Sequence, residues 1–218
     1  MIQEIRKFLK DYNLLDAQKT FLVGFSGGFD SMCLLDCLNN IRKDFGFRLV
    51  AIHLNHNWRG ESALKEQENC KKYCEKNNIE FYTETLSDDI KKTETIAREK
   101  RQEFFKFCYK KYSADALFLA HTKSDNTETL LYRLAKGTGV NGLCGILEYS
   151  ELEFCKIYRP LMKFSRNEIL DYCENNFLSP NDDSSNADVK YARNFIRHNV
   201  VPLLKSINQN VDDAFQTL

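Results

Sequence analysis

Short apolar runs alternate with longer amphipathic segments along the first 160 residues. The short runs predict strands at Thr20–Gly24, Arg48–Leu54, Glu80–Thr85, Ala116–Ala120 and, more weakly, Lys156–Tyr158. Between them, apolar residues recur at three- and four-residue steps, which predicts helices over Met32–Ile41, Leu64–Asn77, Glu94–Tyr112 and Asn126–Ala135. This alternation predicts an α/β fold in which a parallel, Rossmann-like sheet carries helices on both faces.

Both ends of the chain have the pattern of helices. The first 13 residues place apolar side chains at helical spacing, and residues 166–177 do the same. Residues 179–188 form a polar stretch, and a further helix is expected from Val189 to Val201, where Pro202 would end it. We expect a catalytic domain over residues 1–178 and a helical extension over residues 179–218. The last residues read like the start of another helix, so we also expect the chain to be a fragment that lacks a C-terminal domain.

Composition excludes some classes of protein. Lysine plus arginine number 31 and aspartate plus glutamate number 31, so any contact with nucleic acid must come from local clusters of positive charge. The chain has neither a signal peptide nor an apolar run long enough to span a bilayer, which predicts a cytoplasmic protein with no membrane contact. The eight cysteines form no C-x-x-C pair, and we expect them to be reduced and to pack in the core.

A glycine-rich loop follows the first predicted strand and opens a helix. Its sequence is Ser26-Gly27-Gly28-Phe29-Asp30-Ser31. Adjacent glycines permit close approach of a ligand, and the amide groups at a helix start bind anionic oxygens. Asp30 suits such a site if it binds a divalent cation, and the loop lacks the lysine of kinase-type phosphate loops. A plain turn with Asp30 at a helix start is the alternative, but the complete pattern favours a phosphate site.

This loop is similar to that of the PP-loop ATP pyrophosphatases, whose fold is adenine nucleotide α-hydrolase-like. The resemblance implies that Ser26, Gly27, Gly28 and Ser31 bind the β- and γ-phosphates of ATP. It also implies that Asp30 binds Mg²⁺ and is catalytic. ATP would then be cleaved between the α- and β-phosphates, with transfer of AMP to an oxygen atom.

Further motifs resemble those of the lysidine synthetases, in the order of that family, over residues 20–205. They are His53-Leu54-Asn55-His56 followed by Trp58-Arg59-Gly60-Glu61-Ser62, Ala97-Arg98-Glu99-Lys100-Arg101, residues 120–129 (AHTKSDNTET), residues 136–143 (KGTGVNGL), Arg159-Pro160-Leu161, Asp183-Ser184-Ser185-Asn186, and Arg193-Asn194 with Arg197 and His198. Within this resemblance His53 borders the adenine and Arg59 meets phosphate. Each motif alone also suits a capped turn, whereas their ordered sum is specific.

Two arginines and two carboxylates carry the proposed chemistry. Arg98 and Arg101, three apart on one helix face, suit a phosphate and a base edge with developing negative charge, and Arg101 is taken as catalytic. A solvated basic face is the alternative. Asp125 and Glu128 also stand three apart, and the resemblance assigns them to the lysine ammonium, as catalytic and substrate-binding residues.

Three further points concern the acidic motif of residues 120–129. His121 precedes the carboxylates, and the resemblance makes it a substrate-binding residue. Ser124 stands where the family usually has aspartate. The alternative interpretation is a helix cap, with Ser124 or Asp125 near the cap and Glu128 reaching back.

Contacts to RNA are expected at two further places. Gly137, Thr138 and Gly139 would bring backbone close to RNA or nucleotide. Lys190, Arg193 and Arg197 form a stripe on the last predicted helix, opposite Tyr191, Ile196 and Val200. That stripe either contacts phosphates or is the solvated face of a helix packed on the core.

The resemblance implies a reaction and its partners. ATP adenylates O2 of the wobble cytidine of tRNA(Ile), which has a CAU anticodon; free L-lysine then attacks C2, and AMP and pyrophosphate leave. A homodimer is one arrangement that we consider. One alternative is a PP-loop tRNA thiolase, but the lack of a C-x-x-C pair argues against it. A second is a glutamine-dependent synthetase, which would need an amidotransferase partner or an N-terminal cysteine. A third is a non-catalytic nucleotide- or RNA-binding module.

Overall fold

The molecule is built on one mixed sheet. The computed structural model describes residues 1–87, 89–181 and 192–217, with only the backbone at Asn141. The strands are β1 (Thr20–Gly24), β2 (Arg48–Asn55), β3 (Glu80–Thr85), β4 (Ala116–Phe118), β5 (Tyr149–Leu152) and β6 (Cys155–Tyr158), in the order β3-β2-β1-β4-β6-β5. All neighbouring pairs are parallel except β5 with β6. The predicted α/β class is confirmed.

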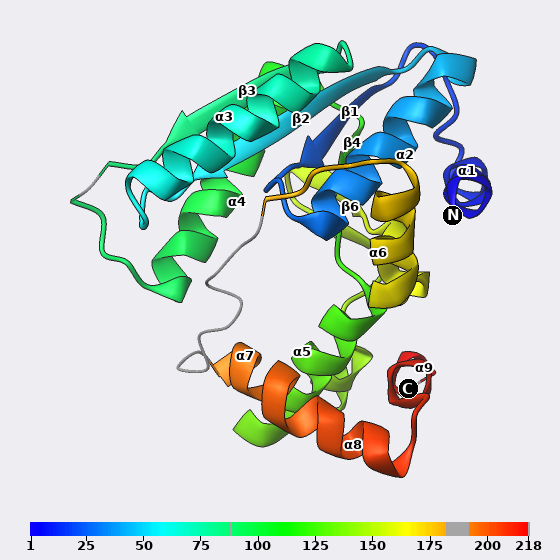
Figure 1. Cartoon of the computed structure of the whole chain (residues 1–218), viewed down its shortest axis with the longest axis vertical. Coiled ribbons are helices and arrows are strands. Elements are labelled where there is room, and N and C mark those ends of the chain that lie inside the picture. Colours follow the sequence, from blue (N-terminus) through cyan, green and yellow to red (C-terminus); the bar gives the residue numbers. More distant parts are fainter. Residues whose placement is uncertain (88, 182–191, 218) are drawn as a thin grey trace.

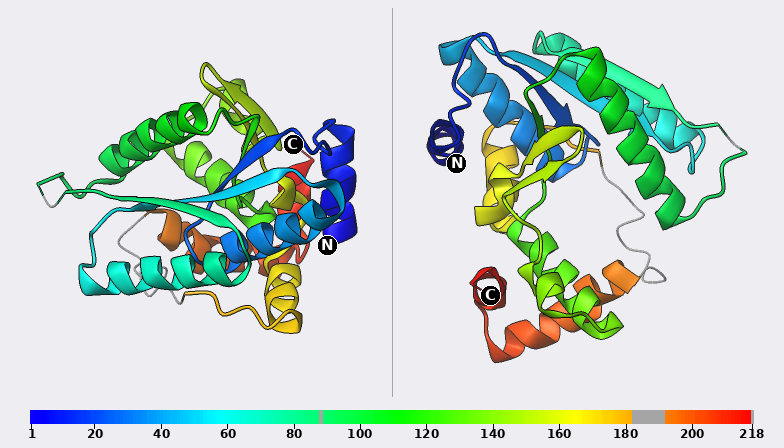
Figure 2. Two further views of the ribbon diagram at one scale, coloured as in Figure 1. Left: turned by 90° about the horizontal axis from the view of Figure 1, so that it is seen from above. Right: turned by 180° about the vertical axis from the view of Figure 1, so that it is seen from behind.

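Helices cover both faces of the sheet (Figures 1 and 2). The helices are α1 (Ile2–Asp11), α2 (Phe29–Phe45), α3 (Glu61–Lys76), α4 (Glu94–Lys111), α5 (Lys123–Lys136), α6 (Arg166–Asn175), α7 (Ala192–Phe195), α8 (Val201–Ile207) and α9 (Val211–Gln216), with 3₁₀ turns at Val140–Cys144 and Pro160–Lys163. Alternate residues of β1 point to opposite faces: Phe21 and Val23 pack with α2, whereas Leu22 packs with Phe104 of α4.

One strand was not predicted from the sequence. β5 forms an antiparallel edge hairpin with β6, and its residues are half-buried or exposed. An edge strand with little burial has no strong apolar pattern, so the sequence signal is weak. β4 also ends at Phe118, two residues before the predicted limit, while β2 runs one residue further, to Asn55.

The prediction that Pro202 ends the last long helix is wrong. α7 continues through a π segment (Ile196–Val200) into α8. The N–H of Val201 donates to the carbonyl of Ile196, five residues back, and Pro202 then lies in the first turn of α8. Proline is tolerated there because the wider turn before it already alters the helical hydrogen-bond ladder. The predicted helix start at Val189 lies outside the described residues.

The final helix, α9, packs against α5. The Thr127 hydroxyl donates to Asp212 at 2.7 Å, and Lys123 pairs with Asp213. In Figure 1 these helices lie beyond the carboxyl end of β4, below the sheet. α5 is therefore held from the C-terminal side of the chain, while the division into domains at residue 178 stays a prediction. Among the described helices, none is long and apolar enough to cross a membrane.

Candidate active site

The predicted phosphate loop lies where β1 ends and α2 begins. Gly28 is the N-cap of α2 and has no side chain to cap the first turn, so the helix start is open to an anion. Ser31 braces the loop: its hydroxyl accepts from the N–H of Gly27 and donates to the Gly28 carbonyl, each at 3.1 Å. Ser26 and Ser31 lie 3.1 Å apart through their hydroxyl oxygens. The predicted position of the loop between a strand and a helix is confirmed, while its binding of phosphate stays a prediction.

Asp30 is a half-buried carboxylate within the first turn of α2. Its Oδ1 is buried and has no hydrogen-bond partner among the described residues, while its Oδ2 lies 3.9 Å from Nη1 of Arg166. Burial, and next the negative charge of Asp125, raise the pKa of Asp30 to about 6. A carboxylate with a buried, unpartnered oxygen beside an anion-binding helix start fits Mg²⁺.

The acidic pair projects from the start of α5, directly after β4. Thr122 is the N-cap, and Asp125 Oδ2 accepts from the Thr122 N–H at 2.8 Å and from its hydroxyl at 3.0 Å. The alternative of a helix cap is right in placing Asp125 at the cap, but the residue that reaches back to Thr122 is Asp125 itself, and Glu128 takes no part. Glu128 lies one turn further along the same face with its side chain 2% exposed.

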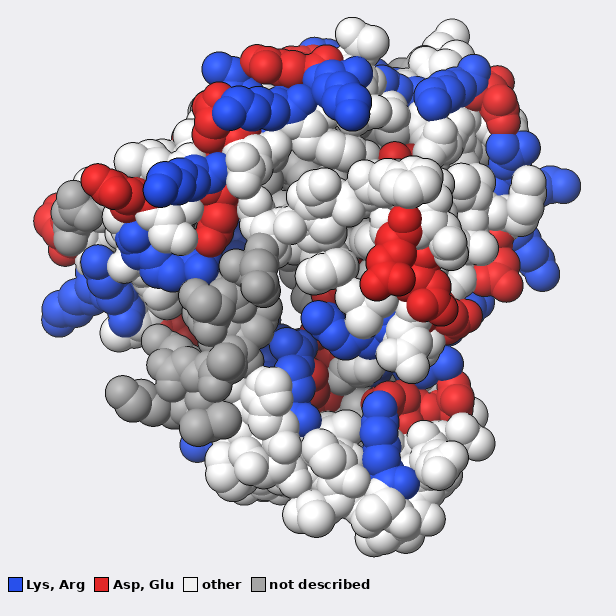
Figure 3. All heavy atoms as spheres, in the orientation of Figure 1, with Lys and Arg blue, Asp and Glu red and all other residues white. Residues whose placement is uncertain are grey.

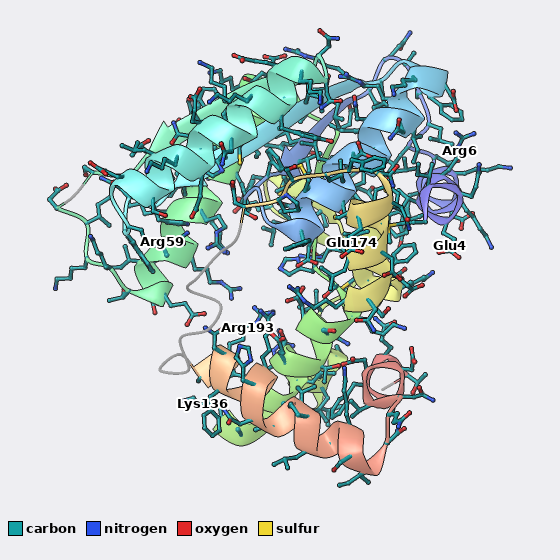
Figure 4. All side chains as sticks on the ribbon, viewed as in Figure 1. Glu4, Arg6, Arg59, Lys136, Glu174 and Arg193 are labelled. Atoms are coloured by element: carbon teal, nitrogen blue, oxygen red, sulfur yellow. The ribbon has the colours of Figure 1, made fainter. Side chains whose placement is uncertain are left out.

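Two arginines from the C-terminal helix hold these carboxylates. Arg193 Nε lies 2.9 Å from Glu128 Oε2, and Arg193 Nη2 lies 3.0 Å from Asp125 Oδ1. Arg197 Nε donates to Glu128 Oε1 at 2.6 Å, and its Nη2 lies 3.6 Å from Asp125 Oδ1. Arg193 and Arg197 share one helix face as predicted, but that face turns inward. In Figure 4 Arg193 lies at the start of α7, on the side of α5.

Two histidines at strand ends are held neutral. His53 Nδ1 lies 2.8 Å from the Phe25 carbonyl and therefore carries the proton, and burial lowers the His53 pKa. His121 Nδ1 accepts from Arg159 Nε at 3.2 Å, because a guanidinium can only donate; its proton is therefore on Nε2. Burial, opposed by Asp125 and reinforced by Arg159, lowers the pKa of His121 to about 4.

Sequence reasoning missed several residues of this site. His56 was quoted in a motif without a role; burial, and then the charge of Arg101, lower its pKa to about 4. Arg166, which faces Asp30, comes from α6 and has no motif. Asn181 donates through its backbone N–H to the Gly27 carbonyl at 2.9 Å. His56 and Arg159 carried a signal, since both belong to quoted motifs.

Other predicted residues lie away from the loop. Arg59 is exposed and pairs with Glu66 at 2.8 Å. Arg98 is exposed on α4, one turn from Arg101, whose charge reaches both His56 and His121. Gly137 ends α5, Thr138 and Gly139 follow it, and a Cβ added at either glycine would meet nothing within 4 Å. The 14 residues of α5 separate them from the acidic pair's end of the helix by roughly 20 Å.

Charged side chains line a depression of the surface. Figure 3 shows the molecule hollowed between the sheet body and the α7–α8 helix, with acidic and basic side chains visible inside. Asp30 and Asp125 are electrostatically coupled across this region, from the ends of the neighbouring strands β1 and β4. Motif residues Asp183, Ser184, Ser185, Asn186 and Lys190, with Tyr191, lie outside the described part of the chain.

A glycine-rich loop at an uncapped helix start, beside a half-buried aspartate and at the carboxyl ends of parallel strands, is typical of a nucleotide-binding α/β domain. The chain belongs to the PP-loop domain family, whose model matches residues 1–204.

The curated proteins that the chain resembles include tRNA(Ile)-lysidine synthases. The chain is 37% identical over 217 residues to the tRNA(Ile)-lysidine synthase of Francisella tularensis subsp. tularensis, covering 98% of this chain and 51% of that protein. It is 35% identical to the tRNA(Ile)-lysidine synthase of Clostridium tetani, covering 97% of this chain and 46% of that protein. The chain thus spans about half the length of the curated relatives it matches.

Solved structures support the fold. The U34-tRNA thiolase NcsA of Methanococcus maripaludis, solved with its [4Fe-4S] cluster, superposes with a TM-score of 0.82 at 18% identity, over 99% of this chain and 75% of that one. The NH₃-dependent NAD synthetase of Campylobacter jejuni gives a TM-score of 0.55 at 14% identity, over 100% of this chain and 86% of that one. At these identities the likeness concerns the fold alone.

Proposed function

We propose that this chain is the ATP-using catalytic part of a cytoplasmic enzyme that ligates free L-lysine to C2 of the wobble cytidine of tRNA(Ile). The observation that carries the proposal is the pairing of two sites. The glycine-rich loop and Asp30 lie close enough to the acidic pair that the charge of Asp125 raises the pKa of Asp30. The lysidine synthase relatives, similar over nearly the whole chain, support the choice of reaction.

The nucleotide would bind at the loop. The amide groups of Gly27 and Gly28 and the hydroxyls of Ser26 and Ser31 would hold the β- and γ-phosphates, and Asp30 would bind Mg²⁺. The buried, unpartnered Oδ1 of Asp30 supports the metal role. When bound, magnesium ATP supplies the adenylyl group that turns the O2 oxygen of cytidine into a leaving group. His53 would border the adenine. Arg59 would give up its ion pair with Glu66 and bind a phosphate instead.

The amino acid would bind at the acidic pair. Asp125 and Glu128 already hold two cationic groups, which shows the charge they prefer, and the ε-ammonium of lysine would replace part of those contacts. Arg193 and Arg197 would then turn toward phosphate. His121, neutral and with its proton on Nε2, can donate a hydrogen bond to the base or the lysine.

The RNA would lie across the arginine-bearing surface. Arg101, whose charge reaches both His56 and His121, would stabilise negative charge developing on the cytidine, with Arg98 on a neighbouring phosphate. Gly137, Thr138 and Gly139 are exposed or half-buried at the far end of α5, where they would meet the backbone of the tRNA. We expect weak tRNA affinity from these 218 residues alone.

The test is direct. A tRNA(Ile) transcript with a CAU anticodon is incubated with ATP, Mg²⁺, L-lysine and the protein, then digested and analysed by mass spectrometry. We expect one cytidine to gain lysine, no change in tRNA(Met), and no product with Asp30→Ala. Lysine-free samples should still exchange pyrophosphate into ATP if the base is adenylated first.

Other results would identify other functions. Sulfur in place of lysine would indicate a thiolase, although the curated relatives do not favour one. ATP binding with neither product nor pyrophosphate exchange, at protein and tRNA concentrations high enough to form the complex, would indicate a non-catalytic module and overturn the proposal.

A further inference from the structure

Gly27 is pressed against a residue from a distant part of the chain. Its φ is +87°, and a Cβ built on it would lie 2.4 Å from Nδ2 of Asn181 and 2.6 Å from Sγ of Cys70. The side-chain amide of Asn181 therefore packs against the Cα of Gly27 in the phosphate loop. Asn181 follows α6 by six residues, beyond the part of the fold that forms the sheet.

The backbone N–H and both polar groups of the Asn181 side chain have partners. Its backbone N–H donates to the Gly27 carbonyl at 2.9 Å. Its side-chain Oδ1 accepts from Asn69 at 2.9 Å, and Nδ2 donates to the Glu66 carbonyl at 3.2 Å. Both side-chain partners belong to α3. Asn181 thus connects helix α3 to the phosphate loop.

The bond to Gly27 sets the direction of one peptide group. The Gly27 carbonyl and the Gly28 N–H belong to the same trans peptide, so they point in opposite directions. Holding the carbonyl toward Asn181 turns the Gly28 N–H to the opposite side, where it makes a long hydrogen bond of 3.4 Å to the Ser26 hydroxyl at the start of α2. A phosphate oxygen would take the place of that hydroxyl. Between two glycines such a peptide could otherwise flip at little cost and present its carbonyl oxygen to an anion.

We propose that Asn181 is a positioning residue for the phosphate loop, which orients the Gly27–Gly28 peptide so that the Gly28 N–H faces the phosphates of ATP. The inference rests on the proposed function, since it assumes that this loop binds a nucleotide. The segment after α6 would then contribute to the affinity for the nucleotide. Preorganised amide donors raise affinity because the cost of ordering them is met during folding.

The experiment compares probes that do and do not use the loop. Dissociation constants for magnesium ATP, magnesium pyrophosphate and adenosine are measured by calorimetry with the full chain and with Asn181→Ala. We expect the constants for ATP and pyrophosphate to rise about tenfold and that for adenosine to change less than twofold. Asn176→Ala is the matched control: Asn176 also donates to a backbone carbonyl, at 2.8 Å, but from the end of α6 and without contact to the loop.

A second variant separates positioning from general loss of structure. Asn69→Ala removes only the partner of Asn181 Oδ1, and we expect a rise of about threefold for ATP. In the Asn181→Ala background the same change should have no further effect, because Asn69 acts through Asn181. Should Asn181→Ala fail to fold, the split between pyrophosphate and adenosine is measured with Asn69→Ala alone.

The outcomes distinguish this inference from the proposed function. Normal ATP binding by the unaltered chain together with an unchanged pyrophosphate constant in Asn181→Ala would refute the positioning role and leave the proposed function intact. Equal losses for adenosine and pyrophosphate would also refute it. Absence of magnesium ATP binding by the unaltered chain would overturn both.

Discussion

Arg197 donates through Nε to Oε1 of Glu128 at 2.6 Å, across the space between the C-terminal helix and α5. The Glu128 side chain is 2% exposed, and Arg193 reaches its other oxygen at 2.9 Å. One buried carboxylate is thus shared by two guanidinium groups from residues 65 and 69 positions further along the chain. These contacts make the helix of residues 192–207 part of the wall of the candidate active site.

Removing the Glu128 charge should destabilise the protein. Glu128→Gln leaves two guanidinium groups facing a neutral amide in a mostly buried position, and we expect a loss of about 3 kcal/mol in the free energy of unfolding. Urea denaturation measures it. Glu80→Gln is the matched control, because Glu80 pairs with Arg48 at 2.6 Å with both side chains exposed. A loss above about 1 kcal/mol there, or below it at Glu128, would contradict this reasoning.

Removing the Asp30 charge should have the opposite effect on stability. The pKa of Asp30 is about 6 in the folded protein and about 3.9 when unfolded, so the native state binds more protons between these values. Ionisation of Asp30 therefore costs stability as pH rises from about 4 to about 6. We expect Asp30→Asn to stabilise the ligand-free protein by about 1–2 kcal/mol at pH 7, after allowance for partial exposure.

The gain in stability of Asp30→Asn should vanish near pH 4, and the same variant should lose Mg²⁺-dependent ATP binding. A gain that is equal at both pH values would mean that burial of the charge is not its cause.

Magnesium ATP affinity should depend on pH through the same group. A protonated Asp30 cannot bind a cation well, so affinity should be flat above about pH 6.5 and fall roughly tenfold per pH unit below about 6. Titrations between pH 5 and 8 test this, with adenosine as the probe that should show no such slope. Persistence of the slope in Asp30→Asn would assign it to another group.

Gly27 should tolerate no side chain. In Gly27→Ala the new Cβ meets Asn181 and Cys70 at 2.4 and 2.6 Å and must adopt a φ near +87°. We expect about 1–3 kcal/mol of destabilisation by calorimetric melting, together with at least a tenfold loss of ATP affinity. Gly139→Ala is the stability control, since its φ is −79° and the space around it is open. Equal stability of the two variants would show that the loop is looser than its contacts indicate.

Arg159 should control the ionisation of His121. Arg159→Met removes both the positive charge and the donor to Nδ1, and both changes favour a proton on that nitrogen. The pKa of His121 should therefore rise from about 4. The chain has four histidines, so nitrogen-15 NMR titration can follow each one. An unchanged His121 pKa would show that burial and the other arginines, rather than Arg159, keep it neutral.

Much of the fold was predictable because its signals are local. Apolar runs and helical spacing located the strands β1 to β4 and the helices between them, since a strand buried on both faces must be apolar. The Ser26–Ser31 pattern likewise located the phosphate loop, because a turn of this kind needs adjacent glycines. The edge strand β5 and the helix continuing past Pro202 were missed, since neither depends on a strong local pattern.

The sequence by itself determined the α/β layers, the loop, and the spacing that puts Asp125 and Glu128 on one helix face. Only the tertiary structure decided what those carboxylates contact. The arginines that hold them, the guanidinium that orients His121, and the asparagine on Gly27 all come from segments distant along the chain. Such partners are set by how the chain returns to the carboxyl ends of the sheet, and no period or short motif encodes that geometry.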